Sequence, residues 1–233
     1  LLASQPNKSI ALVKKNDPLI NETINKKNFK QKIIKIDSLK NDKILKQLKN
    51  KYFLSFGNKE NLSFILKIAK TLKLDDKDLL KTLNQFKGLK YRQQIIYENK
   101  KITIINDSKS TSFASSENLL KSLKNVYWIL GGIPKKGDKF KLLKKNCENL
   151  KAFIFGKNHK EFRKNLKNKI SVKNVKKLED ALNEIFLDIR KKKLRKNIIL
   201  FSPAGASFDS FKNFEDRGEY FNQLVKKFIN AKR

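Results

Sequence analysis

A strand, a loop of small residues and a helix follow one another within residues 197–230. The apolar run Ile198–Phe201 is too short and too rich in β-branched side chains for a helix, and it is typical of a buried strand. Pro203 and Gly205 then interrupt the pattern, where small side chains let the backbone approach another group. In open α/β sheets the ligand crevice lies past the carboxyl ends of the strands, so we expect a binding site at residues 202–208.

Short apolar strands alternate with helical patterns along the rest of the chain. Strands are expected at residues 9–13, 32–36, 52–56, 93–97, 101–105, 126–130, 151–156 and 170–175, of which the fourth and fifth form a hairpin. We expect Pro18 in a turn and a helix over Phe140–Leu150. The alternation favours an α/β fold whose mostly parallel sheet is covered by helices on both faces. The pattern changes at Gly88, which predicts two domains, 1–88 and 89–233.

The composition bounds the class of protein. In 233 residues, 39% hydrophobic side chains are enough for a packed core, and no apolar run is long enough to span a membrane. The first residues lack the basic and apolar regions of a signal peptide. A single cysteine, Cys147, excludes an internal disulfide and fits a reducing cytosol, so we expect a cytoplasmic protein without a membrane partner. Because methionine is absent, we expect a fragment that lacks its natural amino terminus.

The net charge of +33 is extreme for a chain of this length. Taken alone, it favours a basic nucleic-acid-binding α/β protein or a protein that binds an anionic membrane. The lysines, however, are scattered over all the expected helices and loops, and no recognition motif accompanies them. An AT-rich coding bias would produce many lysines that are exposed to solvent. Such lysines explain the net charge without a surface that binds nucleic acid. We therefore expect no specific nucleic-acid partner.

A polar cluster, INDSKSTS, joins an expected strand to a helix. Asn106, Asp107, Ser108 and Thr111 suit a turn and a helix N-cap, and that structural role is one interpretation. The other is a binding site for a phosphate or a carboxylate, because backbone N–H groups at a helix start and the charge of Lys109 both attract anions. Spacing alone does not decide between the two.

Three further motifs also have plain structural explanations. In FKGLKYR, Arg92 is either one more surface cation or a guanidinium that contacts a phosphate. In GNKEN, the spacing of Asn58 and Asn61 favours helix capping. In GGIPKKGDKF, Gly132 and Gly137 have the spacing of a phosphate-binding loop. Asp-Lys follows them where a Walker A motif needs Lys-Ser or Lys-Thr, which excludes that motif.

Several of these motifs resemble segments of the Mur ligase family. SPAGASFDSFKNFEDRG, Ser202–Gly218, resembles the family's carboxy-terminal signature without a gap. INDSKSTS resembles Asn-Asp-Ser-Lys-Ala-Thr-Asn, with Ser110 and Ser112 in place of Ala and Asn. FKGLKYR keeps Gly, Leu and Arg of the motif at the domain junction, with Lys90 and Tyr91 in place of Pro and His. GNKEN and GGIPKKGDKF match further segments in part, and all occur in the family's order.

The resemblance implies a fold and a reaction. A Rossmann-like carboxy-terminal domain would bind the amino acid, preceded by the end of an α/β P-loop-type ATPase domain. Within the family, the D-glutamate-adding ligases are the most similar. This implies an ATP-dependent amide ligase that joins D-glutamate to UDP-N-acetylmuramoyl-L-alanine in peptidoglycan precursor synthesis. A sibling ligase that adds another amino acid is the alternative. We expect the enzyme to be a cytoplasmic monomer.

The matching motifs also imply roles for particular residues. The implied catalytic residue is Lys109. The implied substrate-binding residues are Thr111, Lys135, Ser207, Phe208 and Phe214. The implied nucleotide-binding residues are Asn58, Asn61, Arg92 and Asp107. Because Thr111, Lys135 and Ser207 each follow a different expected strand, they can converge at one edge of the sheet.

Other features of a Mur ligase are missing from the sequence. It contains no GxxxxGK[ST] loop, and it lacks the carboxylates and histidine that hold Mg²⁺ in the family. All of these would precede Leu1 in the full protein. We therefore expect the full protein to use ATP and Mg²⁺, with the metal ligands upstream and none in this chain. We also expect this chain alone to be inactive.

Overall fold

The structure is a computed structural model that describes residues 4–37, 43–54, 56–191 and 196–230. The chain separates into two compact units, residues 1–87 and 88–233. Each unit has buried hydrophobic clusters of its own. The assignment of the first unit to an ATP-binding domain and of the second to an amino-acid-binding domain stays a prediction.

The first unit begins with a β-α-β segment. β1 (Ile10–Lys14) and β2 (Lys32–Ile36) pair in parallel, and α1 (Pro18–Lys26) lies between them in the chain. The turn predicted at Pro18 is wrong. Asp17 caps the helix by accepting the backbone N–H of Ile20 at 3.1 Å, and proline is well tolerated in a first helical turn.

A helical segment completes the first unit. Its elements are α2 (Lys43–Gln47), the 3-10 helix η2 (Lys51–Leu54), α3 (Phe56–Thr71) and α4 (Asp76–Gln85). The strand predicted for residues 52–56 is therefore wrong over the described residues, and Ser55 lies outside them. The rings of Tyr52 and Phe53 both pack against Phe86, with centroids 5.3 and 5.7 Å away, and a helical turn lets neighbouring rings reach one partner.

The second unit is built on a six-stranded sheet in the order β3-β4-β9-β5-β7-β8. These strands are β3 (Gln94–Glu98), β4 (Ile102–Asn106), β5 (Val126–Gly131), β7 (Leu150–Phe155), β8 (Ser171–Val175) and β9 (Asn197–Phe201). β3 and β4 form an antiparallel hairpin, and all other neighbours in this sheet pair in parallel. The predicted α/β fold with a mostly parallel sheet is confirmed.

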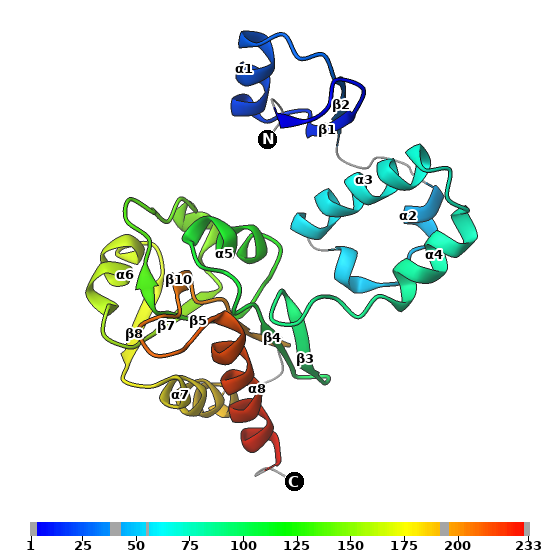
Figure 1. The fold of residues 1–233 in the computed structure, drawn as a ribbon. Helices are drawn as coiled ribbons and strands as arrows, with labels where there is room; N and C mark the ends of the chain where they lie inside the picture. Colours follow the sequence, from blue (N-terminus) through cyan, green and yellow to red (C-terminus); the bar gives the residue numbers. More distant parts are fainter. Residues whose placement is uncertain (1–3, 38–42, 55, 192–195, 231–233) are drawn as a thin grey trace. The chain divides into compact units, whose positions relative to one another are not determined.

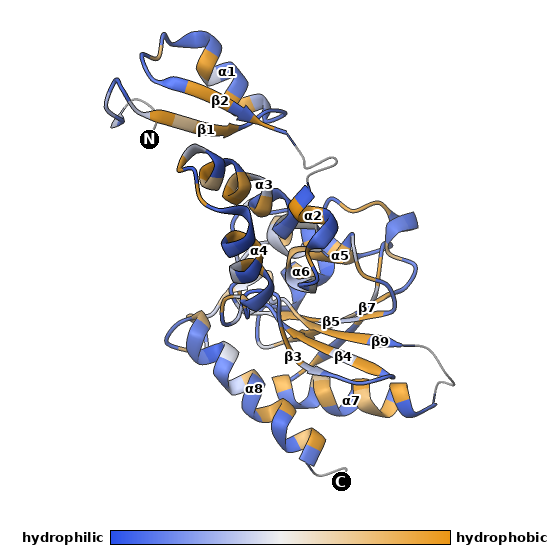
Figure 2. Cartoon of the chain, turned by 90° about the vertical axis from the view of Figure 1, so that its right-hand side faces the viewer, coloured by the Kyte–Doolittle hydropathy of each residue, from blue (hydrophilic) through white to orange (hydrophobic). Residues whose placement is uncertain are grey.

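Helices cover both faces of this sheet (Figure 1). Those on one face are α5 (Phe113–Leu120) and α6 (His159–Leu166), and those on the other are α7 (Leu178–Lys191) and α8 (Phe214–Asn230). Successive residues of β5 serve the two cores: Trp128 packs on the α5 side and Ile129 on the α7 side. Figure 2 shows hydrophobic and hydrophilic residues on both α7 and α8, as expected for amphipathic helices. Within the described ranges, no helix is long and apolar enough to cross a bilayer.

The helix predicted over Phe140–Leu150 is wrong. Its helical part is a short 3-10 helix, η3 (Lys144–Asn146), and its last residue, Leu150, begins β7. Phe140 and Leu142 are two residues apart, and both are buried in the core on the α5 side of the sheet. Side chains at this spacing share a side in an extended chain but not in an α-helix, so core packing decides the local structure.

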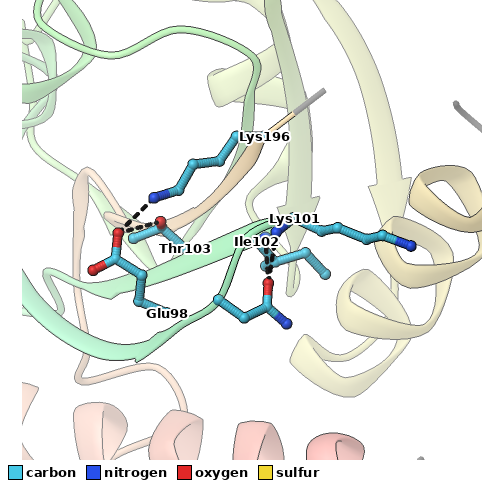
Figure 3. A network of polar contacts seen from close by, with 6 residues as sticks. Glu98, Lys101, Ile102, Thr103 and Lys196 are labelled. Atoms are coloured by element: carbon cyan, nitrogen blue, oxygen red, sulfur yellow. Dashed lines mark hydrogen bonds and ion pairs between the residues drawn. The ribbon is translucent and has the colours of Figure 1, made fainter. Parts of the chain in front are cut away.

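The β3–β4 hairpin is fastened at its turn and along its edge (Figure 3). In the turn, Asn99 Oδ1 accepts two backbone N–H groups of the chain entering β4, both at 2.8 Å. The Glu98 carboxylate accepts Thr103 Oγ1 at 3.4 Å and Lys196 Nζ at 2.5 Å. Lys196 immediately precedes β9, so this carboxylate ties the hairpin to the strand beside it.

Candidate active site

The carboxyl ends of three parallel strands lie side by side in the second unit. Asn106 at the end of β4 pairs with Phe201 of β9, which pairs with Ile129 of β5. The loops that follow these strands, here called the β4, β5 and β9 loops, span residues 107–112, 132–139 and 202–208. They leave the sheet at one edge, which is the usual position of a ligand crevice in this class of fold.

Buried polar side chains fix the start of the β4 loop. Asn106, 0% exposed, donates from Nδ2 to the Gly218 carbonyl and to Asn222 Oδ1 of α8, both at 2.8 Å. Its Oδ1 accepts the backbone N–H of Ser108 at 3.1 Å, and Ser108 Oγ donates to the Phe214 carbonyl at 2.8 Å. The β4 loop is therefore bound directly to the first turns of α8.

Asp107 is a buried carboxyl group in this loop. Its Oδ1 accepts the backbone N–H of Gln93 at 3.1 Å, and its Oδ2 accepts the hydroxyl of Ser202 at 2.8 Å. Burial raises the pKa of Asp107 to about 7, although both hydrogen bonds and the charge of Arg92 act in the opposite direction. The charge of this carboxyl therefore changes with pH near neutrality.

A chain of serine hydroxyls runs from Asp107 to the start of α5. Its members, in order from the carboxyl, are Ser202, Ser116, Ser110, Ser115 and Ser112, with neighbouring oxygens 2.8 to 2.9 Å apart. Ser112 is also the N-cap of α5. In three of these four contacts either oxygen can be the donor, whereas Ser110 donates to Ser115.

Arg217 of α8 is a fully buried cation, 0% exposed. Its Nε and Nη2 donate to the Oγ and the carbonyl of Ser108 at 3.1 and 2.7 Å, and its Nη1 donates to the Gly205 carbonyl at 2.9 Å. Burial lowers the pKa of Arg217 to about 10, while the charge of Asp209 raises it, so the guanidinium stays charged at neutral pH. Arg217 thus holds the β4 and β9 loops against α8.

Arg217 was not among the residues singled out from the sequence, although a signal was present. It lies three residues after Phe214 and four before Phe221, on the buried stripe of the helix. A charged residue on such a stripe is rarely buried unless it is paired. Ser116 and Ser202 gave no comparable signal, because serine suits an exposed turn equally well.

Lys109 of the β4 loop lies over the aromatic ring of Phe214, with Nζ 3.9 Å from the ring centre. The structure therefore brings the predicted catalytic residue together with one of the predicted substrate-binding residues. The cation–π contact orients the ammonium group without neutralising its charge. Thr111, two residues further along the loop, is exposed.

The β5 and β9 loops pair through two short antiparallel strands, β6 (Ile133–Pro134) and β10 (Gly205–Ala206), and the β5 loop then turns out to solvent. At Gly132 (φ 103°) a Cβ atom would lie 2.3 Å from the Ala206 carbonyl oxygen, so only glycine fits. Lys135 is exposed, in a turn closed by the hydrogen bond from the Asp138 N–H to the Lys135 carbonyl at 3.0 Å. The Asp138 carboxylate accepts the N–H of Phe113 at the start of α5 at 2.5 Å, which anchors the turn.

The β9 loop ends in a compact turn. Ser207 is 3% exposed, and its carbonyl accepts the backbone N–H groups of Ser210 and Phe211 at 3.2 and 2.9 Å. Phe208 is 72% exposed, although it is a large apolar residue. Within the described chain, no hydrogen bond joins Ser207 to Thr111 or Lys135. The three residues lie in the three loops at one edge of the sheet, and their roles stay predictions.

The predicted nucleotide-binding residues lie in both units. In α3 of the first unit, Asn58 is buried and donates to the Tyr52 carbonyl at 2.8 Å, whereas Asn61 is exposed. Arg92 is exposed and precedes β3 in the second unit. Among the residues that the structure describes, no group of three His, Cys, Asp or Glu side chains could hold a metal ion.

Comparison with models of known protein families finds no match. Among curated proteins, the UDP-N-acetylmuramoylalanine–D-glutamate ligase of Wolbachia sp. subsp. Brugia malayi (strain TRS) is 36% identical over 175 residues, covering 75% of this chain and 35% of that protein. The ligase of the same name from Petrotoga mobilis (strain DSM 10674 / SJ95) is 37% identical over 185 residues, covering 78% and 42%. A solved structure, a pseudomurein peptide ligase type C from Methanothermus fervidus, aligns with a TM-score of 0.42 and 18% identity over 69% of this chain and 33% of that chain.

The chain spans less than half of the length of the curated relatives named above. The identity to each extends over about three quarters of this chain. The resemblance noted in separate motifs is therefore continuous over most of the sequence. By this similarity, about three quarters of the chain is related to part of the UDP-N-acetylmuramoylalanine–D-glutamate ligases.

Proposed function

We propose that the full protein containing this chain is an ATP-dependent ligase that adds D-glutamate to UDP-N-acetylmuramoyl-L-alanine in peptidoglycan precursor synthesis. The observation that carries the proposal is the meeting of the β4, β5 and β9 loops at one sheet edge. Each of these loops contributes a residue that can bind a carboxylate. The matched relatives, which carry the name of this reaction, support the choice of substrates.

In this proposal the second unit binds D-glutamate through its two carboxylates. Lys135 and Thr111 bind the side-chain carboxylate, because one offers a charge and the other a hydroxyl, and both are exposed. Ser207, with the backbone near Phe208 and Phe214, binds the α-carboxylate. Binding at both ends would fix the direction of the amino group, which is the group that reacts.

In the proposed reaction, Lys109 stabilises developing negative charge. ATP transfers its γ-phosphoryl group to the alanine carboxylate, the amine of D-glutamate attacks the resulting acyl phosphate, and phosphate leaves as the amide forms. Negative charge develops on oxygen in both steps. An ammonium group that is already oriented over Phe214, 3.9 Å from the ring centre, can stabilise that charge without first reorganising.

The nucleotide would be bound in part by residues of this chain. Arg92 is exposed and suits a phosphate, and Asn61 is exposed and suits the adenine. Asp107 would bind the ribose, with its carboxyl already oriented by Gln93 and Ser202. Asn58 donates to the Tyr52 carbonyl. It therefore has a structural role in α3 in addition to its proposed contact with the adenine.

The described residues do not fit a magnesium site, because they contain no cluster of potential ligands. We propose that the ligands of Mg²⁺ lie in a part of the full protein outside this chain. Cytoplasmic location, a monomeric state and the lack of a specific nucleic-acid partner also stay predictions.

Turnover by the full protein tests the proposed function. We expect release of ADP and phosphate that depends on both UDP-N-acetylmuramoyl-L-alanine and D-glutamate, with incorporation of labelled D-glutamate into the product. L-Glutamate in the same assay is the matched control, and it should give little turnover. Turnover with another amino acid but not with D-glutamate would identify a sibling ligase and refute the proposed substrate.

A further inference from the structure

A strained turn begins the second unit. Tyr91 and Gln93 have φ values of 60° and 50°, although neither is glycine. Side chains with a Cβ atom rarely adopt this region, and those that do are held there by their surroundings. Arg92, the proposed phosphate ligand, lies between these two residues.

Tyr91 is held by α8. A Cβ atom on Gly218 would lie 2.4 Å from the Tyr91 ring, so the ring rests directly on the helix backbone. Its hydroxyl donates to Glu219 Oε2 at 2.9 Å. The side chain is 8% exposed, and burial followed by the contact with Glu219 raises the pKa of the phenol, which keeps the donor protonated. The ring and the hydroxyl together fix the turn on the helix.

The same turn is bonded to the β4 loop at two points. The backbone N–H of Lys109 donates to the Tyr91 carbonyl at 3.0 Å, and the N–H of Gln93 donates to Asp107 Oδ1 at 3.1 Å. The charge of Arg92 acts on Asp107 in the direction that lowers the pKa of the carboxyl. Two hydrogen bonds therefore join the turn to the β4 loop, and the joined segments carry three proposed active-site residues, Arg92, Asp107 and Lys109.

We propose that Tyr91 is a positioning residue, which sets Arg92 and Lys109 in place through its contacts with Gly218 and Glu219. The expected effect of Tyr91 on turnover depends on the proposed function. The sequence motif usually has histidine at this position, and here a longer side chain reaches α8 with a hydroxyl.

The test is a double-mutant cycle in the full protein. Tyr91→Phe and Glu219→Ala each remove the same hydrogen bond. We expect each to raise the KM for ATP by about three- to tenfold, because a hydrogen bond contributes about that factor. The double variant should be no worse than either single one. The KM for D-glutamate should rise less than the KM for ATP, because Lys135 and Ser207 lie in other loops and only Thr111 lies in the β4 loop.

Amide hydrogen exchange gives a second readout that needs no turnover. In Tyr91→Phe we expect peptides covering residues 107–112 to exchange about three- to tenfold faster, since the Lys109 N–H is bonded to the loosened turn. Tyr220→Phe is the matched control, because it removes the hydroxyl of an exposed tyrosine on α8, next to Glu219. It should leave both readouts unchanged.

The possible outcomes separate the two proposals. If Tyr91→Phe lowers the melting temperature but leaves the KM for ATP and the exchange of residues 107–112 unchanged, Tyr91 is only structural and the inference is wrong. If the wild-type protein does not ligate D-glutamate, the proposed function fails. Exchange then decides the inference alone: faster exchange supports it and unchanged exchange overturns it.

Discussion

The β4 and β5 loops leave the same edge of the sheet but are built in opposite ways. In the β4 loop, Asp107, Ser108 and Ser110 are buried and hydrogen-bonded to other parts of the unit. In the β5 loop, Lys135 and Lys136 are exposed in a turn that is anchored at its ends. Polar residues that follow a strand can thus serve the internal structure or the ligand.

Substitutions in the two loops should therefore have different consequences. Changes to the buried network should reduce the free energy of unfolding, because they leave polar groups without partners. Changes to the exposed cations should reduce ligand affinity and leave stability intact. The predictions below test this division.

The largest effect is expected from Arg217→Ala. The substitution removes the donors to Ser108 and Gly205 and leaves a cavity in the centre of the buried network. We expect the full protein to lose about 3 kcal/mol or more of stability. Urea unfolding followed by circular dichroism would measure this loss. Arg163→Ala, at an exposed position in α6, is the control and should change stability by less than about 0.5 kcal/mol. Equal unfolding midpoints for the two variants would contradict the role given to Arg217.

Lys135→Ala tests the exposed loop. Loss of a charge-assisted hydrogen bond costs about 1.5–3 kcal/mol, so the KM for D-glutamate should rise about ten- to a hundredfold. The melting temperature and the KM for ATP should hardly change. Lys136→Ala, at the neighbouring and also exposed position, is the matched control. If Lys135→Ala and Ser207→Ala both leave D-glutamate kinetics intact, the proposed binding site for D-glutamate is wrong.

The fold was largely predictable from the sequence, because strand and helix periodicities are local signals. The failures occurred where packing partners distant in the chain decide the structure. Phe140 and Leu142 both enter the core, which an α-helix would prevent. Tyr52 and Phe53 pack on Phe86, which no local pattern indicates. Pro18 was expected in a turn because proline is common in turns. Proline is equally suited to the first turn of a helix, which is where Pro18 lies.

The site was predictable in its position and less so in its internal construction. Strand order cannot be read from one sequence, yet the rule that parallel strands present their carboxyl ends together located the three loops. Which polar residues are buried depends on the helix packed above them. Arg217 and Ser116 contribute to the network from α8 and α5, far from the β4 loop in sequence. Only the three-dimensional structure assigns these residues their partners.

Asp107→Asn tests the buried loop through its dependence on pH. The pKa of Asp107 is about 7 in the folded protein and about 3.8 in its ordinary state. The folded protein therefore retains a proton that the unfolded chain has released between these values. Its contribution to stability is complete below about pH 4 and is lost as the pH rises through about 7.

Wild-type stability should fall across this window by up to about 1.4 kcal/mol per pH unit relative to Asp107→Asn, which cannot titrate. Asparagine can accept from Gln93 and donate to Ser202, so the variant should still fold. Denaturant unfolding at a series of pH values would measure both curves. Parallel curves for the two proteins would show that Asp107 does not titrate as a buried acid.

The smallest effect is expected from Ser110→Ala, which tests whether the serine chain acts as a unit. The related motif has alanine here, so the backbone accepts that residue. After the change, Ser116 keeps its contact with Ser202, and Ser115 keeps its contact with Ser112. Both hydroxyls that lose their contact with Ser110 keep another partner. We therefore expect the free energy of unfolding, measured with urea, to fall by only about 0.5–1 kcal/mol. Ser112→Asn is the control and should be nearly neutral, because asparagine is an equally good N-cap. A loss well above 2 kcal/mol for Ser110→Ala would mean that the hydroxyls stabilise the β4 loop cooperatively and not pair by pair.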